Sequence, residues 1–340
     1  MTFEENLKTK KELRFKNGKF KIVMFSDLHG KITFDRRTVL GVEELTEELK
    51  PDLVLLGGDN VCGNSHLQSE QLFRNSFDDI ANIFESRKIP WAHVFGNHDR
   101  EVGLSESDQQ DIYEQYEYCV SKRGPSDIHG VSNYMLPIKA SEGDKIKFNV
   151  WGMDSHRYNS TVNGHKTILP NHFCTGDDAD HCRPDQIMWY YNTSVELEKY
   201  CGEKVPSIMY FHQPIPEFNL IVRNPEETGM EGEHRERICG TELNYGLFGF
   251  VTARNDVKGI YCGHDHVNTF SGTYAGIHLG YIGALGFNVY MHPDLRGCRV
   301  FEIDENDPAN YKTYLHKVLD NEKLAAIPGM HDYACEYSMY

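Results

Sequence analysis

The chain has 340 residues, of which 39% are hydrophobic and 25% charged, so it can bury a large core in one large domain or two smaller ones. Its 35 Lys and Arg residues against 51 Asp and Glu residues leave a formal net charge of -16. This charge disfavours binding to a nucleic-acid backbone or an anionic membrane, and no basic run offsets it.

The lack of a recognisable targeting signal and the spacing of the cysteines favour a cytoplasmic location. The N-terminal residues lack the apolar stretch of a signal peptide, and no segment has the uninterrupted apolar length that a membrane span needs. The 9 cysteines are scattered without close pairs, so we expect reduced thiols rather than a disulfide framework. We therefore predict a cytoplasmic location, with neither nucleic acid nor membrane as a partner.

The first part of the chain alternates between apolar runs and amphipathic stretches. Apolar runs at 20–27, 52–59 and 91–99 end abruptly in polar residues, as buried strands do where they lead into a loop. Between them, residues 39–49 and 70–88 have the apolar spacing of helices. This alternation predicts an α/β fold with a parallel sheet and right-handed crossovers.

The rest of the chain is richer in strands. A polar, loop-like segment after Asp154 precedes a predicted helix over 184–200. Strands are expected at residues 132–140, 145–154, 207–212, 257–265, 277–283 and 298–304. We predict one domain over 15–305, followed by a C-terminal extension, 306–340, that lacks strong periodicity and packs on the domain.

Carboxylate, imidazole and amide side chains lie just beyond the ends of several predicted strands. These residues are Asp27, His29, Asp59, Asn97, His98, Asp99, His212, His264 and His266. Ligands bind at the carboxyl edge of open α/β sheets, so we expect these side chains to meet at one rim. Gly58, Gly96 and Gly263 would permit the tight turns or close backbone approach that such a convergence requires.

The donor set suits two divalent metal ions. Oxygen and imidazole nitrogen donors without thiolate favour Mn, Zn or Fe, and two-metal hydrolytic sites hold their ions about 3.5 to 4 Å apart. Asp27 and His29 would point the same way in an extended segment and could reach one metal. His264 and His266 could share a metal or be divided between two, and Asp59 is the natural bridge.

Each motif alone has an ordinary structural explanation. Gly58-Asp59-Asn60 is typical of a turn, and His212 by itself would more often be a structural histidine before a proline turn. The Gly-Asn-His-Asp and Gly-His-Asp-His motifs are more specific. Their joint occurrence with the other motifs, in this order, favours the metal site.

In this order the motifs D-x-H, G-D, G-N-H-D, H and G-H-x-H resemble the calcineurin-like metallophosphoesterase superfamily. The resemblance implies a four-layer β sandwich with two mixed sheets flanked by helices. It also implies the ligands, namely Asp27, His29 and His266 for one metal, Asn97, His212 and His264 for the second, and Asp59 for both. It makes His98 the acid or transition-state stabiliser and Asp99 the residue that orients it.

A narrower resemblance covers the second half of the chain. Segments at 153–155, 184–190, 212–218 and 256–268 are similar to purple-acid-phosphatase-related phosphatases of the small plant and yeast Dcr2 types. Purple members have D-x-G as the first motif and a tyrosine three residues after the second aspartate. This chain has His29 and Cys62 at those positions, so we expect a colourless protein with no implied need for ferric iron.

Two loops depart from the family pattern. The loop from 156 to 182 contains His165, His172, Cys174, His181 and Cys182, for which an extra zinc site is one hypothesis and an ordinary surface loop the default. Segment 217–245 includes the charged stretch MEGEHRER and is expected to form part of the mouth of the site, where it could select leaving groups.

The leading hypothesis is an enzyme, a metal-dependent phosphomonoesterase acting on a small phosphorylated molecule or a phosphoprotein. A bridging hydroxide would attack in line while His98 assists the leaving oxygen. Phosphodiester hydrolysis of a nucleotide or lipid head group is the alternative activity. A non-catalytic metal-binding scaffold is the third hypothesis, but scaffolds lose ligands, and the full ligand set and His98 are present here. The natural substrate, the metal and the oligomeric state cannot be read from the sequence.

Overall fold

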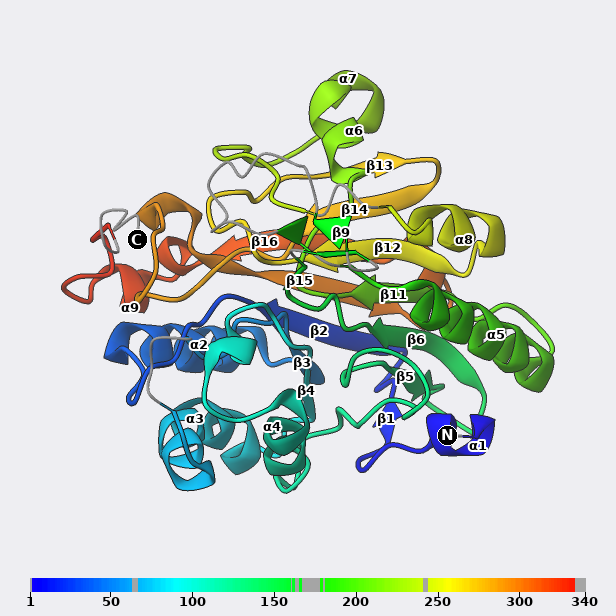
Figure 1. Ribbon diagram of the computed structural model, residues 1–340, viewed down its shortest axis with the longest axis horizontal. Helices are drawn as coiled ribbons and strands as arrows, with labels where there is room; N and C mark the ends of the chain where they lie inside the picture. Colours follow the sequence, from blue (N-terminus) through cyan, green and yellow to red (C-terminus); the bar gives the residue numbers. More distant parts are fainter. Residues whose placement is uncertain are drawn as a thin grey trace.

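Two large β-sheets form the centre of the computed structural model, which describes residues 2–62, 67–159, 161–162, 165–166, 178–179, 181–240 and 244–333 (Figure 1). In spatial order, the five-stranded sheet contains β16 (Lys312–Lys317), β15 (Gly297–Asp304), β2 (Lys19–Phe25), β3 (Leu53–Leu56) and β4 (Trp91–His93). The seven-stranded sheet contains β1 (Leu13–Arg14), β5 (Tyr134–Lys139), β6 (Ile146–Gly152), β11 (Ser207–Tyr210), β12 (Val257–Cys262), β14 (Ile277–Tyr281) and β13 (Ser271–Tyr274). Two short ribbons pair β7 (Tyr158–Asn159) with β10 (Asp178–Ala179) and β8 (Thr161–Val162) with β9 (His165–Lys166).

Both large sheets are mixed. β2, β3 and β4 are parallel, whereas β15 is antiparallel to β2 and to β16. In the other sheet β6, β11, β12 and β14 are parallel, and β5 and β13 are antiparallel to β6 and β14. Parallel neighbours bring their carboxyl ends to one edge, so the loops after β2, β3 and β4 lie together, as do those after β11 and β12.

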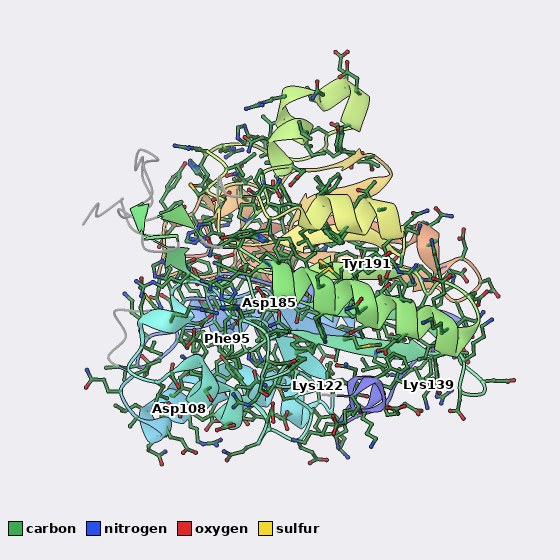
Figure 2. The ribbon with its side chains drawn as sticks, turned by 45° about the vertical axis from the view of Figure 1, so that its right-hand side comes forward. Phe95, Asp108, Lys122, Lys139, Asp185 and Tyr191 are labelled. Atoms are coloured by element: carbon green, nitrogen blue, oxygen red, sulfur yellow. The ribbon has the colours of Figure 1, made fainter. Side chains whose placement is uncertain are left out.

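Helices cover the outer faces of the sheets. The α-helices are α1 (Phe3–Leu7), α2 (Arg36–Leu49), α3 (Glu70–Ser86), α4 (Glu106–Tyr113), α5 (Pro184–Cys201), α6 (Phe218–Arg223), α7 (Pro225–Thr228), α8 (Leu247–Arg254) and α9 (Glu322–Ala325). Short 3-10 turns are η2 (Asp99–Glu101), η3 (Pro293–Leu295), η4 (Pro308–Asn310) and η5 (Val318–Asp320). Figure 1 shows α2, α3 and α4 on one side of the molecule and α5 and α8 on the other. Asp108 marks α4 in Figure 2, and Asp185 and Tyr191 mark α5.

The two crossover helices of the five-stranded sheet begin and end at signals in the sequence. The side chain of Asp35 accepts a hydrogen bond from the backbone N–H of Arg37 at the start of α2, and Ser69 caps α3 in the same way. α2 ends where Lys50 adopts a left-handed backbone just before Pro51, which cannot continue a helix.

Alternating side chains along the strands create separate apolar cores. Ile22 and Met24 of β2 lie in the core between the two sheets. Val23 and Phe25 of the same strand pack into a second core with α2 and α3. A third core, which includes Met209 of β11, joins the outer face of the seven-stranded sheet to α5 and α8. The layers are therefore helix, sheet, sheet, helix, and the predicted four-layer sandwich with two mixed sheets is confirmed.

Elements with weak apolar patterns escaped the sequence prediction. In the run at 91–99 the strand ends at His93, earlier than the apolar residues indicated, and the rest of the run leads into the loop with the motif residues. β16 was not predicted because it is an edge strand whose side chains are all exposed or half-buried, so it lacks a buried face. Within the described ranges, no helix combines the length and the apolar character required to span a bilayer.

Candidate metal centre

The site is built from loops at the carboxyl ends of strands in both sheets. Asp27 and His29 follow β2, Asp59 follows β3, and Asn97 and His98 follow β4 of the five-stranded sheet. From the seven-stranded sheet, His212 follows β11, and His264 and His266 follow β12. The rim predicted from the sequence is therefore assembled by two sheets facing each other, rather than by one.

Several site residues have a left-handed backbone, which is unusual for residues other than glycine. The φ angles are 55° at Asp27, 48° at His29, 50° at Asp59 and 75° at His264. The prediction that Asp27 and His29 project from an extended segment is therefore wrong, although both side chains reach the same place. Non-glycine residues in this conformation cluster at functional sites, where surrounding contacts hold them.

Hydrogen bonds tie the loops together. The backbone N–H of Asp27 donates to the carbonyl of Gly58 at 3.0 Å, and that of His29 to the carbonyl of Asp59 at 2.9 Å. The carboxylate of Asp59 accepts from the backbone N–H of His98 at 2.8 Å. The carboxylate of Asp27 accepts from the N–H of His264 at 3.2 Å, which joins the two sheets.

Glycines allow this close approach, as the sequence predicted. A Cβ atom on Gly58, where φ is +94°, would lie 2.6 Å from Nδ1 of His212. A Cβ on Gly96 would collide with the carboxylate of Asp59. One on Gly263 would lie 2.6 Å from the carboxylate of Asp27. Larger residues at these positions would displace the side chains of the site.

Two groups of buried donors share one carboxylate. Asp27, His29, Asp59 and His266 form the first group, and Asp59, His212 and His264 form the second, with the donor atoms of each group within 4.8 Å of one another. In the first group, Nε2 of His29 lies 3.3 Å from Nε2 of His266. Two imidazole nitrogens at this distance, beside two carboxylates, suit a cation between them.

Contacts behind the groups fix which imidazole nitrogen faces the site. Nδ1 of His212 lies 2.9 Å from the carbonyl oxygen of Gly57, and Nδ1 of His266 lies 3.1 Å from that of Tyr290. Both rings therefore present Nε2 to the site, as metal-binding histidines do when the other nitrogen donates to a carbonyl. Nε2 of His212 also lies 3.1 Å from Oδ1 of Asn97, which places the Asn97 amide at the second group.

The electrostatics fit a cation as well. Burial raises the pKa of Asp27, but a hydrogen bond from His266 and the charge of His212 lower it to about 2. Burial also opposes ionisation of Asp59, yet His212 and other imidazoles hold its pKa well below the usual range. Burial lowers the pKa of His29 to about 3, so its ring is neutral and has a lone pair to offer. Among the described residues, the ion-pair partners of these two carboxylates are histidines, so divalent cations would satisfy the buried charge.

His98 and Asp99 differ in what they contact. The ring of His98 lies edge-on to that of His29, with centroids 5.2 Å apart, and its Nδ1 lies 2.6 Å from Oε2 of Glu101. Asp99 instead accepts from the backbone N–H groups of Gly96 at 2.7 Å and Val61 at 3.0 Å. The prediction that Asp99 orients the His98 ring is therefore corrected. The buried Asp99 fixes the loops around the site, and Glu101 is the acidic partner of the ring.

Sequence analysis missed Glu101 because it lies outside the Gly-Asn-His-Asp motif. The signal that could have found it is its spacing of three residues from His98, which brings side chains together in a 3-10 turn. Burial lowers the pKa of His98, but the carboxylates of Asp59 and Glu101 together have the larger effect and raise this pKa to about 9. Burial and the charge of Asp59 raise the pKa of Asp99 to about 7.

The charged segment expected at the mouth lies beside the loop that carries His266. Glu236 accepts from the backbone N–H of Val267 at 2.7 Å and from the hydroxyl of Tyr290 at 2.8 Å. The ring of Tyr290 stacks on that of His266, with centroids 4.3 Å apart. This segment thus supports His266. Sequence analysis did not single out Tyr290, which stands in a run without a recognisable motif.

The possible extra zinc site falls mainly outside the described residues. His172 and Cys174 lie there, and so does the side chain of His165. Among the described residues of this loop, Nε2 of His181 lies 2.9 Å from the carbonyl oxygen of Gln213, and its Nδ1 accepts from the backbone N–H of Cys182. Both ring nitrogens of His181 are therefore engaged with the protein.

A family model described as calcineurin-like phosphoesterase matches residues 20–268, which include every residue of both donor groups. The chain belongs to the calcineurin-like phosphoesterase family. The resemblance inferred from the motifs is confirmed, and the chain is a phosphate ester hydrolase. The shared Asp59 and the buried Asp and His cluster suit the two metal ions of such a centre.

Relatives agree with the family assignment, and a solved structure shares the fold. The chain is 30% identical to "Probable inactive purple acid phosphatase 14" of Arabidopsis thaliana over 314 residues, covering 83% of this chain and 74% of that protein. It is 29% identical to "Phosphatase DCR2" of Saccharomyces cerevisiae over 278 residues, covering 74% of this chain and 45% of that protein. A dimetal phosphatase from Danio rerio shares the fold, with a TM-score of 0.53 and 12% identity over 88% of this chain and 99% of that one.

Proposed function

We propose that this calcineurin-like phosphoesterase is a phosphomonoesterase that works with two divalent metal ions. The observation that supports the proposal is Asp59, whose carboxylate belongs to both donor groups and would be shared by two ions. The proposed ligands are Asp27, His29 and His266 for the first ion, Asn97, His212 and His264 for the second, and Asp59 for both. Oxygen and imidazole donors suit Mn, Zn or Fe.

Two bound ions would draw charge from the phosphoryl oxygens and activate water for attack. The residues of the chain supply the rest of the chemistry. The backbone of His98 is fixed by the carboxylate of Asp59, and Nδ1 of its ring is engaged by Glu101. Nε2 of His98 is then the atom that donates a proton to the leaving oxygen or stabilises the phosphoryl group.

One observation favours a monoester as the substrate. The chain is similar to "Probable inactive purple acid phosphatase 14" and "Phosphatase DCR2", both of which are named as phosphatases. The names of three relatives include the word "inactive", so an activity assay is the decisive measurement. A phosphoprotein or a small phosphorylated molecule is the proposed substrate class.

The test compares an aryl phosphate monoester with an aryl phosphate diester. Purified protein is stripped of metal, loaded in turn with Mn, Zn or Fe, and its metal content is measured by mass spectrometry. We expect two ions per chain and faster hydrolysis of the monoester. Preference for the diester would replace the proposed substrate class. Full metal content without hydrolysis of either ester would contradict the proposed phosphomonoesterase activity and favour a non-catalytic metal-binding scaffold.

A further inference from the structure

The 3-10 turn after β4 brings Glu101 onto His98. The backbone N–H of Glu101 donates to the carbonyl of His98 at 3.1 Å, which closes the turn η2. Side chains three residues apart are eclipsed in a 3-10 helix, so the local backbone sets the carboxylate over the imidazole. Oε2 of Glu101 then lies 2.6 Å from Nδ1 of His98.

Glu101 is held from its other side by the opposite sheet. Nη2 of Arg157 lies 2.6 Å from Oε1 of Glu101, so the two carboxylate oxygens have different partners. Arg157 follows β6 of the seven-stranded sheet, whereas Glu101 follows β4 of the five-stranded sheet. Arg100 forms a parallel ion pair with Asp154, so two ion pairs join the same two loops.

The contact with Glu101 can fix the orientation of the His98 ring. The side chain of His98 is 34% exposed, so packing alone does not fix its ring. A hydrogen bond to Glu101 needs only an N–H on Nδ1, which both the neutral and the protonated imidazole can provide. With Nδ1 engaged, Nε2 is the nitrogen that remains for a substrate.

We propose that Glu101 is a positioning residue that sets the ring of His98 for the phosphoryl group, with Arg157 holding Glu101 in place. The proposal rests on the proposed function, because it needs a reaction in which His98 takes part. A contact that orients a reacting group contributes mainly to turnover, since misplacement by about 1 Å can reduce a rate by about 10²-fold.

The kinetic test uses Glu101→Ala and Glu101→Gln. We expect Glu101→Ala to lower kcat about 10- to 100-fold, with KM and metal content unchanged. Glu101→Gln should recover part of this loss, because the carboxamide oxygen can accept the same bond from Nδ1. The matched control is Glu106→Gln, since Glu106 is similarly exposed, at 28% against 24%, but its carboxylate pairs with Arg100 rather than with His98. A fall in metal content, or an equal loss in the control, would overturn the proposal.

A double mutant separates positioning from general support of the fold. If Glu101 acts through His98, adding Glu101→Ala to His98→Ala should cause no further loss of kcat. If the two losses multiply, Glu101 acts independently of His98 and the proposal is overturned.

A spectroscopic measurement tests the contact without using activity. In protein labelled with ¹⁵N-histidine, the Nδ1 proton of His98 should give a hydrogen-bonded signal that His98→Ala identifies by its loss. We expect this signal to disappear or shift in Glu101→Ala and to persist in Glu106→Gln. An unchanged signal in Glu101→Ala would overturn the positioning role even if the enzyme is active. A responsive signal in a protein that hydrolyses no phosphate ester would support the contact and contradict only the proposed function.

Discussion

At the residue scale, Asp27, His29, Asp59 and His264 adopt a left-handed backbone that costs each of them about 1 to 2 kcal/mol. Hydrogen bonds between neighbouring loops hold this conformation, as in the bond from the N–H of His29 to the carbonyl of Asp59. The strain turns the side chains of consecutive loops toward a common centre. Such residues are therefore sensitive to changes that leave the rest of the fold intact.

Asp59→Asn should lower the occupancy of both metal ions. The amide replaces the one carboxylate that the two donor groups share, and a neutral group cannot balance the charge of two cations. Metal content per chain, measured by mass spectrometry after loading with Mn or Zn, checks this result. Asp304→Asn, at a half-exposed position at the end of β15, is the control and should bind as the wild type does. Full metal content in Asp59→Asn would remove the bridging assignment.

His98→Ala should lose most turnover and keep both metal ions. Removing a general acid typically lowers the rate about 10²- to 10⁴-fold. The deficit should be smaller with a nitrophenyl ester than with an alkyl phosphate, because a good leaving group needs less protonation. Initial rates on both esters and metal content are the measurements. Equal deficits would indicate stabilisation of the phosphoryl oxygens, and loss of metal would show that His98 is misassigned.

The iron-loaded protein should be colourless. The expectation comes from the resemblance: purple members of that group owe their colour to a tyrosinate ligand, and this chain has Cys62 at that position. Tyr290 is close to the site but donates its hydroxyl proton to Glu236 while its ring stacks on His266. A visible absorption spectrum of the iron-loaded protein tests this expectation. A strong charge-transfer band would mean that a tyrosine has become a ligand.

At the scale of elements, the loops after β4 and β6 are joined through the buried Asp154. Its carboxylate pairs with Arg100 and accepts from the backbone N–H groups of Val131 at 2.7 Å and His156 at 3.0 Å. Burial raises the pKa of Asp154, but Arg100, His156 and these bonds lower it from 3.8 to about 2. The ionised carboxylate therefore stabilises the fold.

The pH dependence of stability should show this contribution. Because the folded-state pKa is lowered, the stabilisation is fully present above about pH 4 and is lost as the pH falls toward 2. A shift of this size corresponds to roughly 2 kcal/mol. Unfolding temperatures of Asp154→Asn and wild type should differ at pH 6 and converge near pH 2, whereas Asp144→Asn, at an 83% exposed side chain, should differ little at either pH. If the difference in unfolding temperature between Asp154→Asn and wild type did not change with pH, ionisation of Asp154 would not be the source of the stabilisation.

At the scale of the whole molecule, the segment after residue 305 contributes to the main folded unit. β16 pairs with β15 from Lys312 to Lys317. Beyond it, Val318, Leu324 and Met330 are fully buried in the core that contains α2 and α3. We propose that this part of the predicted C-terminal extension is required by the domain rather than added to it.

Truncation after Glu305 should therefore abolish folding. Burial of each large apolar side chain contributes about 1.5 to 3 kcal/mol, so loss of Val318, Leu324 and Met330 together approaches the net stability of about 5 to 15 kcal/mol of a typical domain. Circular dichroism and thermal unfolding are the measurements. Truncation after Tyr333 keeps all of these residues and is the matched control. A cooperative unfolding transition in the shorter chain would show that the domain ends near residue 305, as the sequence pattern indicated.

The arrangement of strands and crossover helices followed from local patterns. The apolar run that becomes β2, the helix stopped before Pro51 and the buried strand β3 each have a period and an end signal that neighbouring residues determine. The motif residues Asp27, Asp59, His212 and His266 could be chosen because metal chemistry restricts the residue types and their order. β16 could not be predicted in this way, because an edge strand without a buried face lacks a strong apolar period.

The sequence by itself thus determined the order of the motifs along the chain, the type of donor at each strand end and the family. The resemblance also implied how these donors divide, with Asp59 common to both groups, as the structure groups them. Only the tertiary structure decided which carboxylate faces the ring of His98. Asp99 and Glu101 are both acidic and both follow His98 closely, so composition and spacing do not separate them. The turn η2 and the opposing Arg157 do, because they direct Glu101 to the ring while Asp99 points to the backbone of Gly96 and Val61.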